Sequence, residues 1–180
     1  MEKTLSRVLL GLVAMAALAG GLTAQTAAKI GVIDSQRVLE TSAEGKRAIA
    51  QLEDRNKKLQ ADVSKLSEQI KGLETRLTTQ RLTLTPESAQ ALSADLARKQ
   101  TDHKRLSEDA ARELQELQFK LLNKIQSELI PLIEALGKEK NLDIIFDLAK
   151  SGAVYFNPAA DLTVDLIRRY DASKAAPPAK

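Results

Sequence analysis

The stretch that decides the fold is IAQLEDRNKKLQADVSKLSEQIKGLETRL, residues 49–77. Its apolar residues recur at alternating steps of three and four, and one polar residue, Asn56, interrupts them. This repeat is typical of a coiled-coil seam, in which an asparagine fixes the register at some cost in stability. We therefore expect one long helix whose seam is formed by Leu52, Leu59, Val63, Leu66, Ile70, Leu73 and Leu77.

A second helical pattern follows a short interruption at residues 79–85. Thr85 and Pro86 suit the N-cap and the first position of a new helix, and apolar residues then continue at helical spacing from Leu92 to Leu136. Two helices of similar length joined by a short bend predict an antiparallel helical hairpin. At 1.5 Å per residue, such an arm is on the order of 65 Å long.

Two residues mark the base of the second helix. Pro131 falls within the apolar pattern, and proline in a helix interior either kinks the helix or divides it into two pieces. Asn141 suits a left-handed C-cap. We therefore expect a kink or a break near residue 131 and the end of the helix near residue 141.

Short strand patterns stand at both ends of the helical region: KIGVID at 29–34, NLDIIFD at 141–147 and AVYF at 153–156. A lone strand is not stable in water, so we expect these strands to pair. Residues 148–152 are short enough for a hairpin turn, and DLTVDLIRRY at 161–170 predicts a short amphipathic helix. The expected core of this body comprises Ile30, Val32, Ile33, Leu142, Ile144, Ile145, Phe146, Val154 and Tyr155.

The first 28 residues have the pattern of a secretory signal peptide. Lys3 and Arg7 precede an apolar run at residues 8–22, and small residues follow it. Cleavage is expected after Ala24 or Ala28. An uncleaved membrane anchor is the alternative, although the run is short for a membrane span. The pattern predicts export, to a bacterial periplasm.

The remaining chain divides into a body, an arm and a tail. We expect residues 29–48 and 130–171 to form a β body, residues 49–129 to form the arm, and residues 172–180 to be a disordered tail. A body this small buries little apolar area and is rarely stable alone. Sharing its sheet between subunits would remove the open strand edges. The predicted fold class is α+β, with a small sheet or barrel shared between subunits and a long coiled-coil arm.

The composition argues against an enzyme. The sequence of 180 residues has no cysteine and one histidine, His103, which falls on the seam of the second helix. A polar seam residue is a far simpler interpretation of that histidine than a catalyst. No phosphate-binding GxxxxGK[ST] motif and no metal-ligand spacing occur, and a net charge of +3 is too small to indicate nucleic acid. We expect no catalytic site, cofactor, metal or nucleic-acid partner.

Charge is distributed unevenly along the arm. Residues 71–105 hold seven cations and four carboxylates, whereas residues 106–136 hold three cations and six carboxylates. A basic arm tip attracts acidic clients or anionic lipid, although a merely solvated surface, with the leucines packed in the bend, remains an alternative. The candidate contact residues at the tip are Lys71, Arg76, Arg81, Leu82, Leu84, Arg98 and Lys99.

Two segments carry a resemblance to a known family. KIGVIDSQRVLETSAEGKRAIAQLE at 29–53, followed by a long hairpin and then NLDIIFDLAKSGAVYFNPAADLTVDLIRRYD at 141–171, resembles the OmpH-like (Skp) family of periplasmic chaperones. The resemblance covers residues 29–171 and rests on the order and spacing of the segments. It implies a jellyfish-like homotrimer in which a shared β-barrel body carries three arms around a cavity.

The resemblance also implies a function. It predicts a chaperone that works without ATP and holds unfolded outer-membrane β-barrel proteins, with anionic lipid or lipopolysaccharide as a further partner. The rival interpretation is an exported coiled-coil spacer or adaptor that holds no client. A spacer needs sustained seams between chains, whereas the chaperone needs arms that pair within one chain and strands that assemble the subunits.

Overall fold

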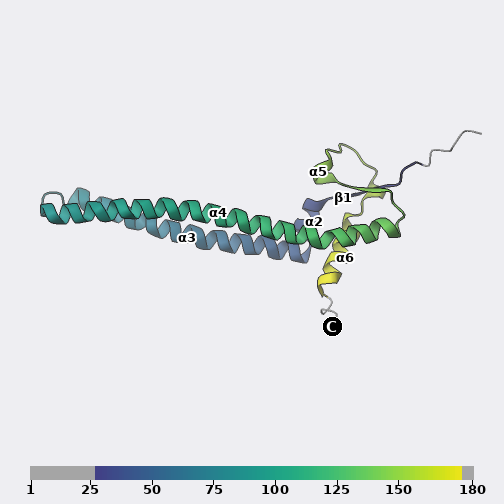
Figure 1. Ribbon diagram of the computed structural model, residues 1–180, viewed down its shortest axis with the longest axis horizontal. Coiled ribbons are helices and arrows are strands. Elements are labelled where there is room, and N and C mark those ends of the chain that lie inside the picture. The colour runs from purple at the N-terminus through teal and green to yellow at the C-terminus, as the bar shows by residue number, and fades with distance from the viewer. Residues whose placement is uncertain (1–26, 176–180) are drawn as a thin grey trace, which may run out of the picture.

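The computed structural model describes residues 27–175, and it consists of a long two-helix rod that ends in a small body (Figure 1). Almost all of the expected signal peptide, up to residue 26, lies outside the described residues, as do residues 176–180 of the expected tail. Within the described part, no helix is both long and apolar enough to cross a membrane.

The rod is formed by α3 (Ala43–Thr79) and α4 (Pro86–Glu139), which lie side by side (Figure 1). Hydrogen bonds link Ser67 to His103 and Gln69 to Lys99. The partner numbers fall along α4 as the residue numbers rise along α3, so the two helices run in opposite directions.

The turn at the end of the rod follows the sequence prediction. Residues 80–85 connect the helices, and Pro86 is the first residue of α4. The hydroxyl of Thr85 accepts a hydrogen bond from the backbone N–H of Ser88 at 3.2 Å, which makes Thr85 the N-cap. The predicted bend and cap are therefore confirmed.

Of the two outcomes expected at Pro131, a division of the second helix is wrong, because α4 runs through this residue as one element. The kink stays a prediction. Pro131 has no backbone N–H, so the carbonyl of Ser127 does not receive the hydrogen bond that a helix would normally give it. Ser127 and Pro131 are both exposed, so water can reach the carbonyl left without a helical donor. The helix ends as expected, with Asn141 in the left-handed region at φ 52°.

The two strands pair although the whole arm separates them. β1 (Ile30–Ile33) lies parallel to β2 (Ile144–Asp147), with Ile30 opposite Ile144. The prediction that strands from both ends of the helical region meet is thus confirmed. Parallel strands need a crossover connection, and here the arm provides it. Within residues 27–175, the other edge of β1 makes one bridge, from Val32 to Asp161.

The predicted third strand and its hairpin are wrong for the described chain. Residues 153–156 are irregular, and residues Leu148–Ser151 form the short helix α5 in place of a turn. Asp147 caps α5 by accepting from the N–H of Ala149 at 3.2 Å, and Gly152 ends it at φ 64°. An aspartate that caps the start and a glycine that ends the last turn explain why these four residues form a short helix and not a hairpin turn.

The core lies where β1, the base of α4 and the C-terminal helix α6 (Thr163–Ala175) meet α2 (Ser35–Thr41). A 3₁₀ turn, η2 (Pro158–Ala160), leads into α6. The core cluster comprises Ile33, Val38, Ala48, Ile125, Leu129, Leu136, Leu162, Leu166 and Tyr170. Since α6 continues to Ala175, the expectation of a disordered tail from residue 172 is wrong for residues 172–175.

The predicted body core is only partly buried in the single chain. Val32 and Ile33 are buried, and Leu142 and Ile145 pack half-buried against the core. The other five predicted residues are exposed in the single chain, so their place in the core of a body shared between subunits stays a prediction: Ile30, Ile144, Phe146, Val154 and Tyr155.

Helices α2 and α3 are separated by a single extended residue, Ser42. Its hydroxyl caps α3 by accepting from the N–H of Gly45 at 3.1 Å, and its own N–H donates to the carbonyl of Val38 at 3.0 Å. This corner brings the first turn of α3 against the end of α2. A Cβ on Gly45 would lie 1.9 Å from the carbonyl oxygen of Leu39, so only glycine fits there.

Candidate functional site

The seam of the arm is incompletely buried. Leu59 is buried, whereas the other six predicted seam residues are half-buried. Two helices alone cover only one side of each seam, so this partial exposure is expected of a free-standing pair. Farther out, the seam becomes polar: Ser67 Oγ lies 2.8 Å from His103 Nε2, and Lys99 Nζ donates to Gln69 Oε1 at 2.8 Å. His103 thus has a structural partner within the arm.

The predicted tip residues divide into paired and unpaired groups. Arg98 forms an ion pair with Asp95 at 2.6 Å, and Lys99 is held by Gln69. Among residues 27–175, no carboxylate lies within ion-pair distance of the remaining tip cations, Lys71, Arg76 and Arg81.

The two predicted tip leucines are also placed differently. Leu82 is 99% exposed at the turn, whereas Leu84 is half-buried. The outer part of the arm therefore presents one fully exposed apolar side chain at the turn and three cations that are free of ion pairs to described residues.

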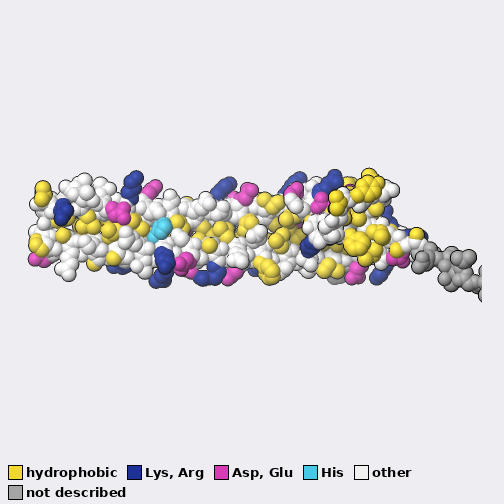
Figure 2. All heavy atoms as spheres, turned by 90° about the horizontal axis from the view of Figure 1, so that it is seen from above, with side chains coloured by type: hydrophobic (Ala, Val, Ile, Leu, Met, Phe, Trp, Pro, Cys, Tyr) yellow, Lys and Arg dark blue, Asp and Glu magenta, His cyan; other side chains and the backbone are white. Residues whose placement is uncertain are grey.

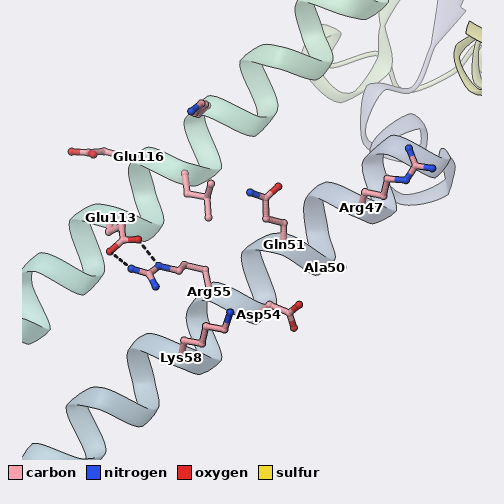
Figure 3. Close-up of a pocket in the computed structure, with 10 residues that line it drawn as sticks. Arg47, Ala50, Gln51, Asp54, Arg55, Lys58, Glu113 and Glu116 are labelled. Carbon is pink, nitrogen blue, oxygen red and sulfur yellow. Dashed lines mark hydrogen bonds and ion pairs between the residues drawn. The ribbon is translucent and has the colours of Figure 1, made fainter. Parts of the chain in front are cut away.

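One side of the arm carries a charged groove of about 750 Å³ between the two helices (Figure 3). Arg55 from α3 points across it to Glu113 on α4 and donates two hydrogen bonds, one of them from Nη2 to Oε2 at 2.8 Å. The hydrogen bond from Arg55 lowers the pKa of the Glu113 carboxyl below its ordinary value. The positive charge of Arg55 and the negative charge of Glu113 cancel each other. Among the described residues, no cluster of His, Asp or Glu side chains could hold a metal ion. The Arg55–Glu113 pair in this groove therefore has a structural role, joining α3 to α4.

Another side of the arm carries an apolar groove, formed by two adjoining hollows of about 390 and 350 Å³ that share Asn56, Ala111 and Leu114. Small side chains leave it open, notably Ser107, Ala110 and Ala111. Figure 2 shows yellow side chains continuing between the two helices along the arm, with charged side chains at the edges. The groove exposes seam residues that the sequence pattern assigns entirely to packing.

Where the arm joins the body, a polar cluster ties α6 to α4; we call it the base clasp, comprising Glu128, Tyr170 and Lys174. The hydroxyl of the buried Tyr170 donates to Glu128 Oε2 at 2.6 Å, and Lys174 Nζ donates to Glu128 Oε1 at 2.6 Å. One helical turn away, Lys124 pairs with Glu44 of α3 at 2.6 Å. Three helices are thus fixed together at the base of the arm.

The base clasp shifts the pKa values of its members. Burial raises the pKa of Glu128, but the hydrogen bonds from Lys174 and Tyr170 outweigh it, so the pKa lies below the ordinary value. Burial and the bond to Glu128 raise the pKa of Tyr170 well above its ordinary value. The folded chain therefore favours an ionised Glu128 and a neutral Tyr170. The clasp was not among the features predicted from the sequence, although DLIRRY and the glutamate of α4 both lie on helical patterns.

The substitution Glu128→Gln is expected to destabilise the protein at pH 7 by about 1–2 kcal/mol, because it removes a charge-assisted bond to Lys174. A carboxyl with a lowered folded pKa gives stability above its unfolded pKa, about 4.5, which is lost as pH falls through the folded pKa. The difference in stability between the variant and the native protein should therefore shrink as the pH falls below that value. Urea unfolding followed by circular dichroism at pH 7 and at about pH 3 measures this change.

The matched control is Glu116→Gln, an exposed residue on the same helix outside the clasp. Its effect should stay within about 0.5 kcal/mol at pH 7. A stability loss for Glu128→Gln that is the same at pH 7 and pH 3 would contradict the ionic part of the clasp.

The body leaves one surface open. Ile144 and Phe146 on β2 are each 42% exposed, and Val154 and Tyr155 in the irregular segment after α5 are almost fully exposed. Among the described residues, the outer edge of β2 has no strand partner. An open strand edge beside apolar side chains is a surface that proteins normally cover.

Two of the three comparisons with known proteins gave a match. A search of curated proteins found no match. Among solved structures, a candidate outer-membrane chaperone (OmpH-like) from Caulobacter crescentus CB15 shares the fold with a TM-score of 0.73, at 19% identity over 85% of this chain and 89% of that chain. The sequence model of the family described as "Outer membrane protein (OmpH-like)" matches residues 29–170. This match spans most of the sequence, and the chain belongs to the OmpH-like family.

Proposed function

We propose that this protein is an ATP-independent chaperone that binds unfolded outer-membrane β-barrel proteins and prevents their aggregation. Membership of the OmpH-like family supports a chaperone role in general, and this family is not an enzyme family. The single observation that carries the finer proposal is the contrast between an arm paired within one chain and a body with an open apolar surface. Such a chain can assemble through its body and leave its arms free for clients.

The assembly that fits this contrast is a homotrimer. The body, residues 29–48 and 130–171, exposes a strand edge and the apolar residues of β2 and the following segment. Three copies that share these surfaces would remove the open edges and place three arms, residues 49–129, around a cavity.

The proposed location is the periplasm. The N-terminal pattern up to residue 28 supports export, with cleavage after Ala24 or Ala28. OmpH-like outer-membrane chaperones act in this compartment, where unfolded barrel proteins pass between the two membranes.

Binding in such a cavity is the sum of many weak contacts. A chaperone that holds unfolded chains lowers the free concentration available for aggregation. The exposed cations Lys71, Arg76 and Arg81, together with Leu82, support a tip that attracts acidic clients, anionic lipid or lipopolysaccharide.

The spacer interpretation has less support. It needs seams between chains, whereas α3 and α4 of one chain cover each other along the arm and cross-link through Arg55–Glu113 and Ser67–His103. The seam residues that a spacer would offer to a partner chain already pack against the other helix of the same chain, and only part of their surface stays exposed.

The proposal predicts the behaviour of the chain after removal of its leader. Multi-angle light scattering should give three times the mass of one chain. A urea-unfolded outer-membrane barrel protein diluted into this protein should scatter less light than one diluted into buffer. Raising the salt concentration should weaken client binding if the tip charges contribute. A single-chain mass together with unhindered aggregation of the barrel protein would overturn the proposal.

A further inference from the structure

The backbone nitrogen of Lys29, just before β1, meets a carboxylate. It donates to Asp143 Oδ2 at 2.7 Å, and the backbone N–H of Asp143 donates in return to the Lys29 carbonyl at 2.9 Å. These two residues stand one position before the paired residues Ile30 and Ile144. The reciprocal contact therefore closes the end of the β1–β2 pair, and it joins positions that are 114 residues apart.

The end of α4 fixes the backbone from which the Asp143 carboxylate extends. Asn141 turns the chain in the left-handed region, and the backbone N–H of Leu142 donates to the Gly137 carbonyl at 2.9 Å. The side chain of Leu142 packs half-buried against the core. Asp143 thus lies between an anchored leucine and the first residue of β2, so its carboxylate is held beside the Lys29 nitrogen.

The chemical state of the Lys29 nitrogen depends on where the leader is removed. Within a longer chain it belongs to a peptide bond, which offers one hydrogen and no charge. At the start of a chain it is an ammonium, which offers three hydrogens and a full positive charge. A carboxylate accepts a hydrogen bond from either group, but only the ammonium also neutralises its charge.

Of the two expected cleavage sites, the site after Ala28 produces this ammonium. It has small residues at its last and third-last positions, Ala28 and Thr26, whereas the site after Ala24 has Leu22 at the third-last position. Ala27 and Ala28 are exposed and lie outside β1. Removing them with the leader therefore takes no residue from the strand.

We propose that cleavage after Ala28 creates a new N-terminus on Lys29 and that Asp143 is its receptor, forming an ion pair with the α-ammonium. The precursor cannot form this pair, because its nitrogen at position 29 is uncharged. The proposal depends on export of the chain, and it is independent of chaperone activity.

The ion pair acts at the point that joins the two ends of the body. β1 and β2 form the only sheet within residues 27–175, and the whole arm lies between them in sequence. Lys29 and Asp143 are both exposed, so the gain is that of a surface ion pair. It arises only after the leader has been removed, so processing strengthens the strand pair once the chain has crossed the membrane.

The first test is the intact mass of the protein purified from the periplasm of a bacterium that expresses the full chain. We expect a chain that begins at Lys29. A chain that begins at Gln25 would overturn this proposal and leave the proposed export intact. A chain that keeps its leader would overturn both.

The second test compares the two possible products, residues 29–180 and 25–180, each with and without Asp143→Asn. Asparagine keeps an acceptor oxygen and loses the charge. We expect the substitution to lower the melting temperature by about 2–3 °C in the chain that begins at Lys29. In the chain that begins at Gln25, where position 29 is an uncharged peptide nitrogen, we expect a loss of less than about 1 °C.

The matched control is Asp102→Asn, which removes an exposed carboxylate from the arm. It should change the melting temperature equally in the two products. Thermal unfolding by circular dichroism at one protein concentration measures all six chains. An effect of Asp143→Asn that is equal in both products would show that the ammonium contributes nothing, and it would overturn the proposal whatever the chaperone activity of the protein.

Discussion

Replacing Gly45 with alanine is expected to lower the stability of this protein by about 3 kcal/mol, the upper part of the range for overpacking a filled site. A Cβ at this position would lie 1.9 Å from the carbonyl oxygen of Leu39 and 2.7 Å from its carbonyl carbon. The obstacle is backbone, so no side-chain rotation relieves it. Either the corner at Ser42 opens or the end of α2 unwinds.

Opening that corner would disturb the core as well as the helices. Ser42 is buried and bonds to both Val38 and Gly45, and Val38 is fully buried in the core. A shift of α2 against α3 therefore leaves apolar surface uncovered where the arm joins the body. For a chain of this size, a loss of about 3 kcal/mol lowers the melting temperature by roughly 6–12 °C.

Gly72→Ala is the matched control, since Gly72 also lies in α3 but has no neighbour within 4 Å of the position of an added Cβ. Alanine is the better helix former there, so this variant should be about 0.5–1 kcal/mol more stable. Thermal unfolding by circular dichroism at one fixed protein concentration compares the two. Equal melting temperatures for Gly45→Ala and the native protein would show that the corner does not depend on glycine.

The arm was predictable from the sequence because its information is local. The heptad steps from Leu52 to Leu77, the cap at Thr85 and the proline at 86 each act within a turn or two of their own position. At the base of α4, the possible break at Pro131 does not occur. Whether a proline breaks a helix depends on solvent exposure at that point, which the apolar pattern alone does not specify.

The body was less predictable because its order comes from contacts distant in sequence. The segment Ala153–Phe156 has strand-forming residues, but the single chain offers it no partner strand. The short helix α5 is set by Asp147 and Gly152, a cap and a stop that were present in the sequence. The burial of Tyr170 depends on Glu128, 42 residues away, and no local pattern marks that pair.

The candidate site likewise has a part that the sequence predicted and a part that it did not. Counting charges by segment identified a basic tip, and the structure leaves three of its cations without an ion pair to described residues. Counting by segment also concealed how charge is arranged around α4, because Glu113, Glu116 and Lys120 are interleaved in sequence with Gln115, Gln118 and Phe119. The signal was available as a helical projection of α4, in which charged and uncharged residues occupy opposite halves.

Placing aspartate at Phe146 and Val154 together is expected to convert the proposed trimer into single chains and to abolish suppression of aggregation. Phe146 is 42% exposed beside the open edge of β2, and Val154 is fully exposed after α5. In the proposed assembly both are covered by neighbouring subunits, where each new carboxylate would be buried without a partner. Since both are exposed in the single chain, the fold of that chain should remain intact.

Leu82→Asp distinguishes loss of assembly from a general effect of adding charge to an exposed apolar residue. Leu82 is 99% exposed at the far end of the arm, so this variant should keep the trimeric mass in light scattering. Circular dichroism should show unchanged helix content for both variants. An undiminished trimeric mass for the Phe146→Asp, Val154→Asp protein would place the subunit contact elsewhere. A single-chain mass with full protection of the barrel protein would instead show that one arm holds a client without a shared cavity.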